Sequence, residues 1–164
     1  MHHRFQRASL APDGFAVDAV KASGDRMQIL LRSRRPWGIC PGCGGQSRRV
    51  QSRYTHRPAD LPLGGRRAEL VILTHRFWCD AVLCERRIFC ERFDGAVLAR
   101  YGRRTQRLET IVHHLGLALG GRPPAGFADR LMIPVSKDTL LRVVRRRVSE
   151  QDGELSVIGI DDFA

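Results

Sequence analysis

Two short, mostly apolar stretches stand near the start of the chain, with a polar bridge between them. They are FAVDAV (15–20) and RMQILLRSR (26–34), and the bridge is KASGD. Short apolar runs on either side of a turn-rich, glycine-containing bridge are typical of two paired strands. The pattern therefore predicts a short β-hairpin.

A second pair of extended segments lies within ADLPLGGRRAELVILTHRFWC (59–79). The dipeptide Gly64-Gly65 joins them and predicts a tight turn. β-Branched and aromatic residues dominate the second segment, a composition that favours strand. We expect one long strand that continues directly into Cys79.

Near residue 95 the apolar spacing changes from that of strands to that of helices. From Thr105 to Leu119 the apolar residues recur at the spacing of one helical face. They are Leu108, Ile111, Val112, Leu115 and Leu119. Gly120-Gly121 is expected to end this helix, and a short second helix is predicted from about Pro124 to Leu131.

A third helix is predicted after Ser136. Pro134 disfavours helix at the preceding residue, so MIPV (132–135) should be a turn. Ser136 is a good N-cap, and Asp138 suits the positive end of the helix dipole. The expected inward residues are Leu140, Leu141, Val144 and Val148. The expected outward residues are Thr139, Arg142, Arg145 and Arg146.

The last apolar run, LSVIGI (155–160), follows the pattern-breaking EQDGE and is typical of a strand covered on both faces. Asp161 and Asp162 come at its carboxyl end, where α/β folds keep their active sites. Successive strand residues point to opposite faces, so at most one of the two can join a catalytic cluster. A loop or capping role is the default alternative.

Composition narrows the class of protein. With 164 residues, the chain suits one ordinary domain or two to three very small ones. Its net charge of +11 indicates a polyanionic partner, nucleic acid before a membrane surface. Because arginine supplies nearly all of this charge, single arginines carry less weight as functional signals.

No apolar run approaches the roughly 18 residues of a membrane span, and no signal peptide precedes the first strand, so we expect a cytoplasmic protein.

The cysteines fall into two close pairs, Cys40/Cys43 and Cys79/Cys84. A C-x₂-C knuckle presents two thiolates to one side of a tetrahedral Zn²⁺, and the glycines after it allow a tight turn. The second pair supplies the remaining two ligands at the end of a strand. The spacing predicts a zinc ribbon whose Zn²⁺ is structural, since four thiolates leave no open position for catalysis.

Other roles fit the cysteines and the nearby histidines less well. A redox CPGC would need to open a helix in a βαβ unit, and here glycines follow it instead. His56 and His75 lie between the pairs and could replace a ligand. Cys90 is left over and is predicted to be a free thiol. His113 and His114 are neighbours on a helix and cannot jointly hold a metal.

The three predicted helices match the plan of a helix-turn-helix domain, in which the third helix enters the DNA major groove. The residues expected to face bases are Lys137, Thr139, Arg142 and Arg146. Those expected to reach phosphates are Arg103, Arg104 and Arg107. A plain helical bundle with a solvated basic face is the alternative.

From Cys40 to Ala164 the chain resembles the ISL-three insertion-sequence transposases of bacteria. The resemblance rests on segments that agree in order and approximate spacing. They are CPGCGG, SRYTHRPADLPLGGRRAEL, RFWCDAVLCERRIF, YGRRTQRL, LGLALGG, PVSKDTLLRVVRR and VIGIDDFA.

This resemblance implies Cys40, Cys43, Cys79 and Cys84 as zinc ligands, a helix-turn-helix domain and a ribonuclease-H-like catalytic domain of the DDE type. In such a domain three carboxylates hold two Mg²⁺ ions for DNA cleavage and strand transfer. Asp161 best matches the first carboxylate, with Asp162 as the adjacent alternative. The other two lie beyond the end of this sequence, so we expect a truncated, catalytically inactive form.

The predicted fold class is α+β: a β-rich zinc ribbon, then a three-helix helix-turn-helix domain, ending in the first strand of an incomplete ribonuclease-H-like domain. The predicted divisions are an amino-terminal hairpin (1–36), the zinc ribbon (37–95), the DNA-binding helices (96–150) and the first catalytic strand (151–164).

The predicted function is recognition of an element's terminal inverted repeats for DNA transposition, with double-stranded DNA as partner and a homo-oligomer left open. A self-contained zinc-ribbon transcriptional regulator is the alternative. RNA binding is disfavoured, because the scattered aromatic residues suggest no stacking platform.

Overall fold

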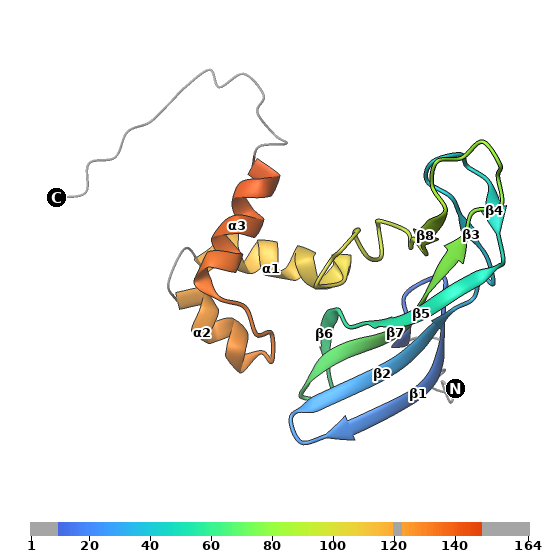
Figure 1. Ribbon diagram of the computed structural model, residues 1–164. Coiled ribbons are helices and arrows are strands. Elements are labelled where there is room, and N and C mark those ends of the chain that lie inside the picture. The colour runs from blue at the N-terminus through green and yellow to red at the C-terminus, as the bar shows by residue number, and fades with distance from the viewer. Residues whose placement is uncertain (1–9, 120–122, 149–164) are drawn as a thin grey trace, which may run out of the picture.

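The structure, a computed structural model, describes residues 10–119 and 123–148 (Figure 1). It is α+β, with a six-stranded sheet, a two-stranded sheet and three helices in the described part. Strands β1 (Phe15–Ser23) and β2 (Arg26–Ser33) form the predicted antiparallel hairpin. The predicted strand 155–160, together with Asp161 and Asp162, lies outside the described residues.

The thirteen-residue strand β7 (Arg66–Trp78) is the centre of the main sheet. One edge pairs in parallel with β2 and then, near its end, antiparallel with β8 (Ile88–Cys90). The other edge pairs antiparallel with β6 (Ala59–Leu63) and then β5 (Val50–His56). Every part of β7 therefore has a hydrogen-bonded neighbour.

The turn between β6 and β7 is the one expected from the glycine pair. Leu63 pairs with Arg66 across Gly64 and Gly65, whose φ angles are 56° and 70°. Two consecutive residues with positive φ form the tight hairpin turn that matches strand twist, and glycine adopts it without a steric penalty.

One face of the sheet carries the first hydrophobic core. Alternate residues of β1, β2 and β7 point to the same face, and residues 93–98 pack over them. The buried members are Phe15, Ile29, Leu31, Leu70, Ile72 and Leu98. The hairpin before residue 37 thus shares a sheet and a core with β7. The proposed division of the chain into domains stays a prediction.

The helices are α1 (Gln106–Leu119), α2 (Pro123–Arg130) and α3 (Lys137–Val148), and they lie beside the β6 end of the sheet (Figure 1). Their bounds agree closely with the prediction. The helices share a second core, whose buried members are Leu108, Val112, Ala128, Ile133, Leu140 and Val143. Among the described residues, none of the helices has the length and apolar character needed to cross a membrane.

The predicted inward face of α3 is partly wrong. Leu141 is 40% exposed, whereas Val143, absent from the predicted set, is 2% exposed. The buried stripe runs through Leu140 and Val143 because the helix turns by about 100° per residue, and this places Leu141 on the rim. Val144 is half-buried.

Both ends of the α2–α3 connection have specific caps. Ser136 Oγ accepts a hydrogen bond from the Thr139 N–H at 3.3 Å, as predicted for an N-cap. At the end of α2, the Ile133 N–H bonds to the Ala128 carbonyl at 2.8 Å and the Met132 N–H to the Asp129 carbonyl at 2.9 Å. This is a Schellman motif, with Met132 in the left-handed position at φ 60°.

Strand β6 connects the sheet to the helices. Ala59 exchanges backbone hydrogen bonds with Arg103 and Thr105 just before α1. The carboxylate of Asp60, 1% exposed, accepts hydrogen bonds from Thr105 Oγ1 at 2.7 Å and from both Nε and Nη2 of Arg107. The hydrogen bond that Arg107 donates to Asp60 raises the pKa of Arg107 above its ordinary value, because the ion pair favours the charged guanidinium.

Asp60→Ala is expected to lower the free energy of unfolding by about 3 kcal/mol, because it removes the buried acceptor shared by Thr105 and Arg107. Urea denaturation of the two proteins measures the difference. The matched control is Asp18→Ala, which breaks an exposed ion pair with Arg32 (2.8 Å) and should cost about 0.5 kcal/mol. Similar losses in both variants would contradict a special role for the Asp60 junction.

Candidate metal centre

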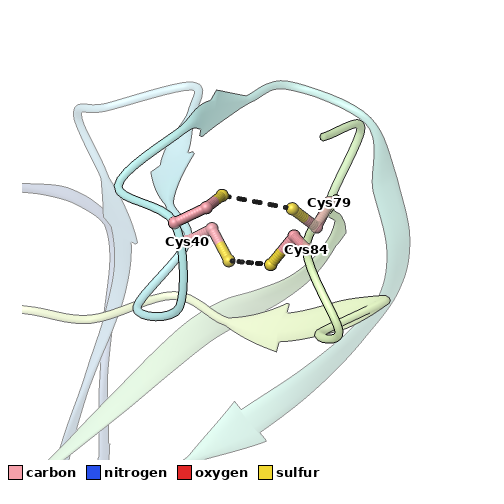
Figure 2. Close-up of side chains that lie close together, drawn as sticks. Cys40, Cys79 and Cys84 are labelled. Carbon is pink, nitrogen blue, oxygen red and sulfur yellow. Dashed lines mark hydrogen bonds between the residues drawn. The ribbon is translucent and has the colours of Figure 1, made fainter. Parts of the chain in front are cut away.

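The predicted zinc ligands lie together at the end of β7 farthest from β6. The facing sulfur pairs are Cys40 Sγ–Cys84 Sγ at 3.8 Å and Cys43 Sγ–Cys79 Sγ at 3.6 Å, and all four sulfurs lie within 4.8 Å of one another (Figure 2). A tetrahedral Zn²⁺ with Zn–S bonds of about 2.3 Å places its sulfurs about 3.8 Å apart. The donor set and its geometry therefore fit a structural zinc ion.

The first two ligands lie on a tight knuckle between β3 (Gly38–Ile39) and β4 (Gln46–Ser47). The Cys40 N–H donates to the Gly45 carbonyl at 2.8 Å, and the Gly44 N–H donates to the Cys40 carbonyl at 2.9 Å. Gly44 has φ 73°, a conformation that favours glycine. The loop thereby turns both sulfurs toward one point.

The other two ligands lie on the connection from β7 to β8. The Cys79 N–H donates to the Arg87 carbonyl at 2.8 Å, and the Cys84 N–H donates to the Ala81 carbonyl at 3.1 Å. Because β7 and β8 are paired up to Trp78 and Ile88, both ends of this connection are fixed. The long strand thus delivers the second cysteine pair to the knuckle.

A small hydrophobic cluster packs against the cysteines. Cys40, Phe77 and Phe89 are each at most 2% exposed, and the two rings lie 5.7 Å apart. A Cβ added at Gly38 would lie 2.7 Å from Phe77 Cδ2, so only glycine fits against these rings. The supporting roles of Gly38, Phe77 and Phe89 were not identified from the sequence, although the C-x₂-C spacing places Gly38 just before the knuckle.

The thiols of the centre differ in acidity. Burial raises the pKa of Cys40, but hydrogen bonds from the backbone N–H groups of Cys43 and Gly42 outweigh it and lower the pKa to about 6. At Cys79 a backbone hydrogen bond from Ala81 lowers the pKa, while burial and the neighbouring thiols raise it to about 12. At Cys84 a backbone hydrogen bond from Arg86 lowers the pKa, but burial together with Cys43 and Cys40 outweighs it, so the pKa is raised.

The two histidines that could replace a ligand, His56 and His75, form hydrogen bonds with other groups instead. His75 Nδ1 lies 2.9 Å from Glu91 Oε2, and His56 Nε2 lies 2.9 Å from the Gly102 carbonyl. Within the described residues, the four cysteines form the one group that could hold a metal ion. Cys90 lies outside this group and is exposed, as a free thiol.

The predicted DNA-contact residues are placed in different ways. Lys137, Arg142 and Arg103 are exposed. Arg104 and Arg146 share the carboxylate of Glu109, at 2.7 Å and 3.7 Å.

Two of the predicted contact residues hold structural positions. Thr139 is half-buried, and its hydroxyl lies 3.0 Å from that of Ser136 at the helix cap. Arg107 forms the bidentate pair with Asp60, so its guanidinium holds α1 to the sheet. Arg145, predicted to lie outward, joins Arg142 and Arg146 along a shallow depression on α3.

The comparisons with known proteins concern the metal centre. Residues 37–84 match the family described as zinc-finger of transposase IS204/IS1001/IS1096/IS1165. The matched segment begins just before the knuckle and ends at Cys84, so it contains all four ligands. Comparisons with curated proteins and with solved structures give no match. The chain therefore contains, at residues 37–84, a zinc-ribbon domain of the type found in ISL3 transposases.

Removal of the metal is expected to unfold the zinc end of the molecule and leave the first core intact. Hydrogen exchange after chelation should show loss of protection at 38–47 and 79–90, because the cluster under the metal is small. Amides of β2 and of the first half of β7 should stay protected. Trp37 and Trp78 flank the zinc end, so their emission should shift to the red.

Cysteine variants provide the matched control for chelation. Cys84→Ser should reproduce the exchange pattern of the chelated protein, whereas Cys90→Ser should bind zinc as the unaltered chain does. Global loss of protection in the chelated protein, including β2, would show that the metal holds the whole sheet.

Zinc affinity is expected to fall steeply with decreasing pH. The raised pKa values of Cys79 and Cys84 keep both thiols protonated near neutral pH, and each must lose its proton to bind zinc. Displacing at least these two protons makes the zinc Kd rise by about a hundredfold or more for each unit decrease in pH. Competition with a chromogenic chelator between pH 7 and about 8 measures this slope, and a slope of one proton or fewer would contradict the expected protonation.

Proposed function

We propose that the chain is the DNA-recognition part of an ISL3-type insertion-sequence transposase, which binds the terminal inverted repeats of its element. The observation that carries the proposal is the four-thiolate cluster within the residues that match a transposase zinc-finger family. The net charge of +11 supports a nucleic-acid partner. The zinc is structural in this proposal, and DNA contact is assigned to the helices.

The helical part supports a helix-turn-helix interpretation. Helices α1 and α3 pack against each other and share their core with α2, while residues 131–136 form the turn before α3. The third helix has a capped amino end and three arginines in its last turn, Arg145, Arg146 and Arg147. We propose that α3 enters the major groove, the docking geometry of this motif.

The predicted DNA-contact residues differ in whether their side chains are free to reach DNA or are held by other residues. Arg142 and Lys137 are exposed on α3 and are proposed to reach base edges. Arg103 is exposed just before α1, and it is proposed to reach a phosphate. Arg107 leaves the proposed set, because its guanidinium is held by Asp60.

The junction at β6 gives these helices a fixed base. Backbone hydrogen bonds from Ala59 to the residues before α1, together with the Asp60 ion pair, attach the reading helices to the zinc-bearing sheet. A rigid base keeps contact residues in register with the duplex at little entropic cost on binding. The catalytic role of Asp161, with Mg²⁺ as its metal, stays a prediction from the family resemblance.

Arg142→Ala is expected to weaken binding to a duplex carrying the element's end by about tenfold, because loss of a base contact costs about 1–3 kcal/mol. Binding to random duplex should change much less. Fluorescence anisotropy with the zinc-loaded chain measures both affinities. Arg26→Ala, the same charge change at the exposed first residue of β2, is the matched control and should leave both affinities nearly unchanged.

Salt titration separates the classes of contact. The slope of log affinity against log salt should be about −0.9 for each phosphate contacted, and Arg142→Ala should keep the slope if Arg142 reads a base. An equal loss on every duplex would assign Arg142 to phosphate contact. Equal affinity of the unaltered chain for element ends and random DNA would overturn the proposed function.

A further inference from the structure

A cleft of about 650 Å³ opens beside the zinc end, on a part of the molecule separate from α3. Strands β5, β7 and β8 and the segment 98–101 line it. Its size falls in the range of about 300–1,000 Å³ that is usual for small-ligand sites. Its aromatic and charged lining includes Tyr54, Arg76, Arg86, Arg92, Arg100 and Tyr101.

The floor of the cleft continues the apolar face of the main sheet. Strand register places Tyr54 opposite Thr74 and His56 opposite Ile72, so these side chains share the face that carries the first core. Leu98 and Phe93 cover that core and also line the cleft. The segment 93–98 covers only part of the core face, and the cleft lies over the part that it leaves open.

Tyr101 stands in the lining of the cleft in a strained conformation. Its φ is 59°, a left-handed value that costs a non-glycine residue about 1–2 kcal/mol, and its side chain is 80% exposed. The turn is fixed on both sides, because the Gly102 N–H bonds to the Ala99 carbonyl at 2.8 Å and the Gly102 carbonyl lies 2.9 Å from His56 Nε2. A strained turn that holds an aromatic ring in water indicates a binding role.

The charges of the cleft suit an anion. Arg76 lies 5.3 Å from the ring of Tyr54, and Arg100 lies 4.7 Å from the ring of Tyr101. The carboxylate among the lining residues, Glu91, is 3% exposed and is bonded to the side chain and backbone N–H of His75. Four arginines thus surround an apolar floor, and because Glu91 is the one carboxylate among the described lining residues, the cleft keeps a net positive charge.

We propose that this cleft binds an unpaired nucleotide of a DNA strand. The base would stack on the ring of Tyr101 above the apolar floor, and the phosphates would meet the arginines. Aromatic faces and arginine together are the chemistry by which proteins hold single-stranded nucleic acid. The choice of DNA over RNA rests on the proposed function, whereas the aromatic and arginine site does not depend on it.

The test compares a blunt fluorescein-labelled duplex carrying the element's end with the same duplex extended by a short single-stranded thymidine tail. The zinc-loaded chain should bind the tailed duplex roughly tenfold more tightly, the usual effect of stacking one base. Tyr101→Asn should reduce this ratio to about one. Asparagine tolerates positive φ, so the variant removes the ring without adding strain. Tyr101→Phe keeps the ring and should keep the ratio.

The outcomes separate this proposal from the proposed function. Arg142→Ala should weaken both probes equally and leave the ratio unchanged. If the blunt duplex fails to bind, the reading role of α3 fails, and labelled oligothymidine alone then tests the cleft through Tyr101→Asn. A ratio near one in the unaltered chain, or a ratio that Tyr101→Asn does not change, would overturn the nucleotide site. Tighter binding of a uridine RNA tail than of the thymidine tail would overturn the choice of DNA.

Discussion

Backbone pairing along both edges of β7 is the constraint on which the other parts depend. Its first residues pair with β6, which holds the helices, and its last residues lead into Cys79 of the metal centre. Between these ends, Leu70 and Ile72 form part of the first core. A strand hydrogen-bonded on both sides has little freedom to shift in register, since a shift by one residue would expose the core face. The metal, the core and the helices are therefore held in one frame.

The metal centre shows what local sequence spacing can predict. The clustering of the four cysteines was predicted, because thiolate pairs separated by two to four residues suit the tetrahedral geometry of zinc. The helix bounds were also close, since caps such as Ser136 and breakers such as Pro134 act within one turn. The errors in the face of α3 arose where two apolar residues, Leu141 and Val143, compete for one inward position.

Contacts between residues distant in sequence were not predictable in the same way. Nothing near Arg107 distinguishes it from the other arginines, and its pairing with Asp60 depends on β6 reaching the start of α1. The cleft is a similar case. Tyr54 and Tyr101 are widely separated in the chain, so local patterns gave no sign that the register of β5 and the turn at Gly102 would bring both to the lining of one cleft. The parallel pairing of β2 with β7 was also invisible to local patterns.

That parallel pairing has a consequence for the order of folding. The chain must travel from the end of β2 to the start of β7 before the two can align, and the C-x₂-C knuckle lies within this crossover. Long-range pairing of this kind slows folding, because the entropy of closing the connection is lost before contacts compensate it. During synthesis the edge of β2 that later pairs with β7 therefore stays unpaired until β7 emerges, and other chains can pair with it in that time. Early capture of zinc by Cys40 and Cys43 would compact the crossover and shorten that period of exposure.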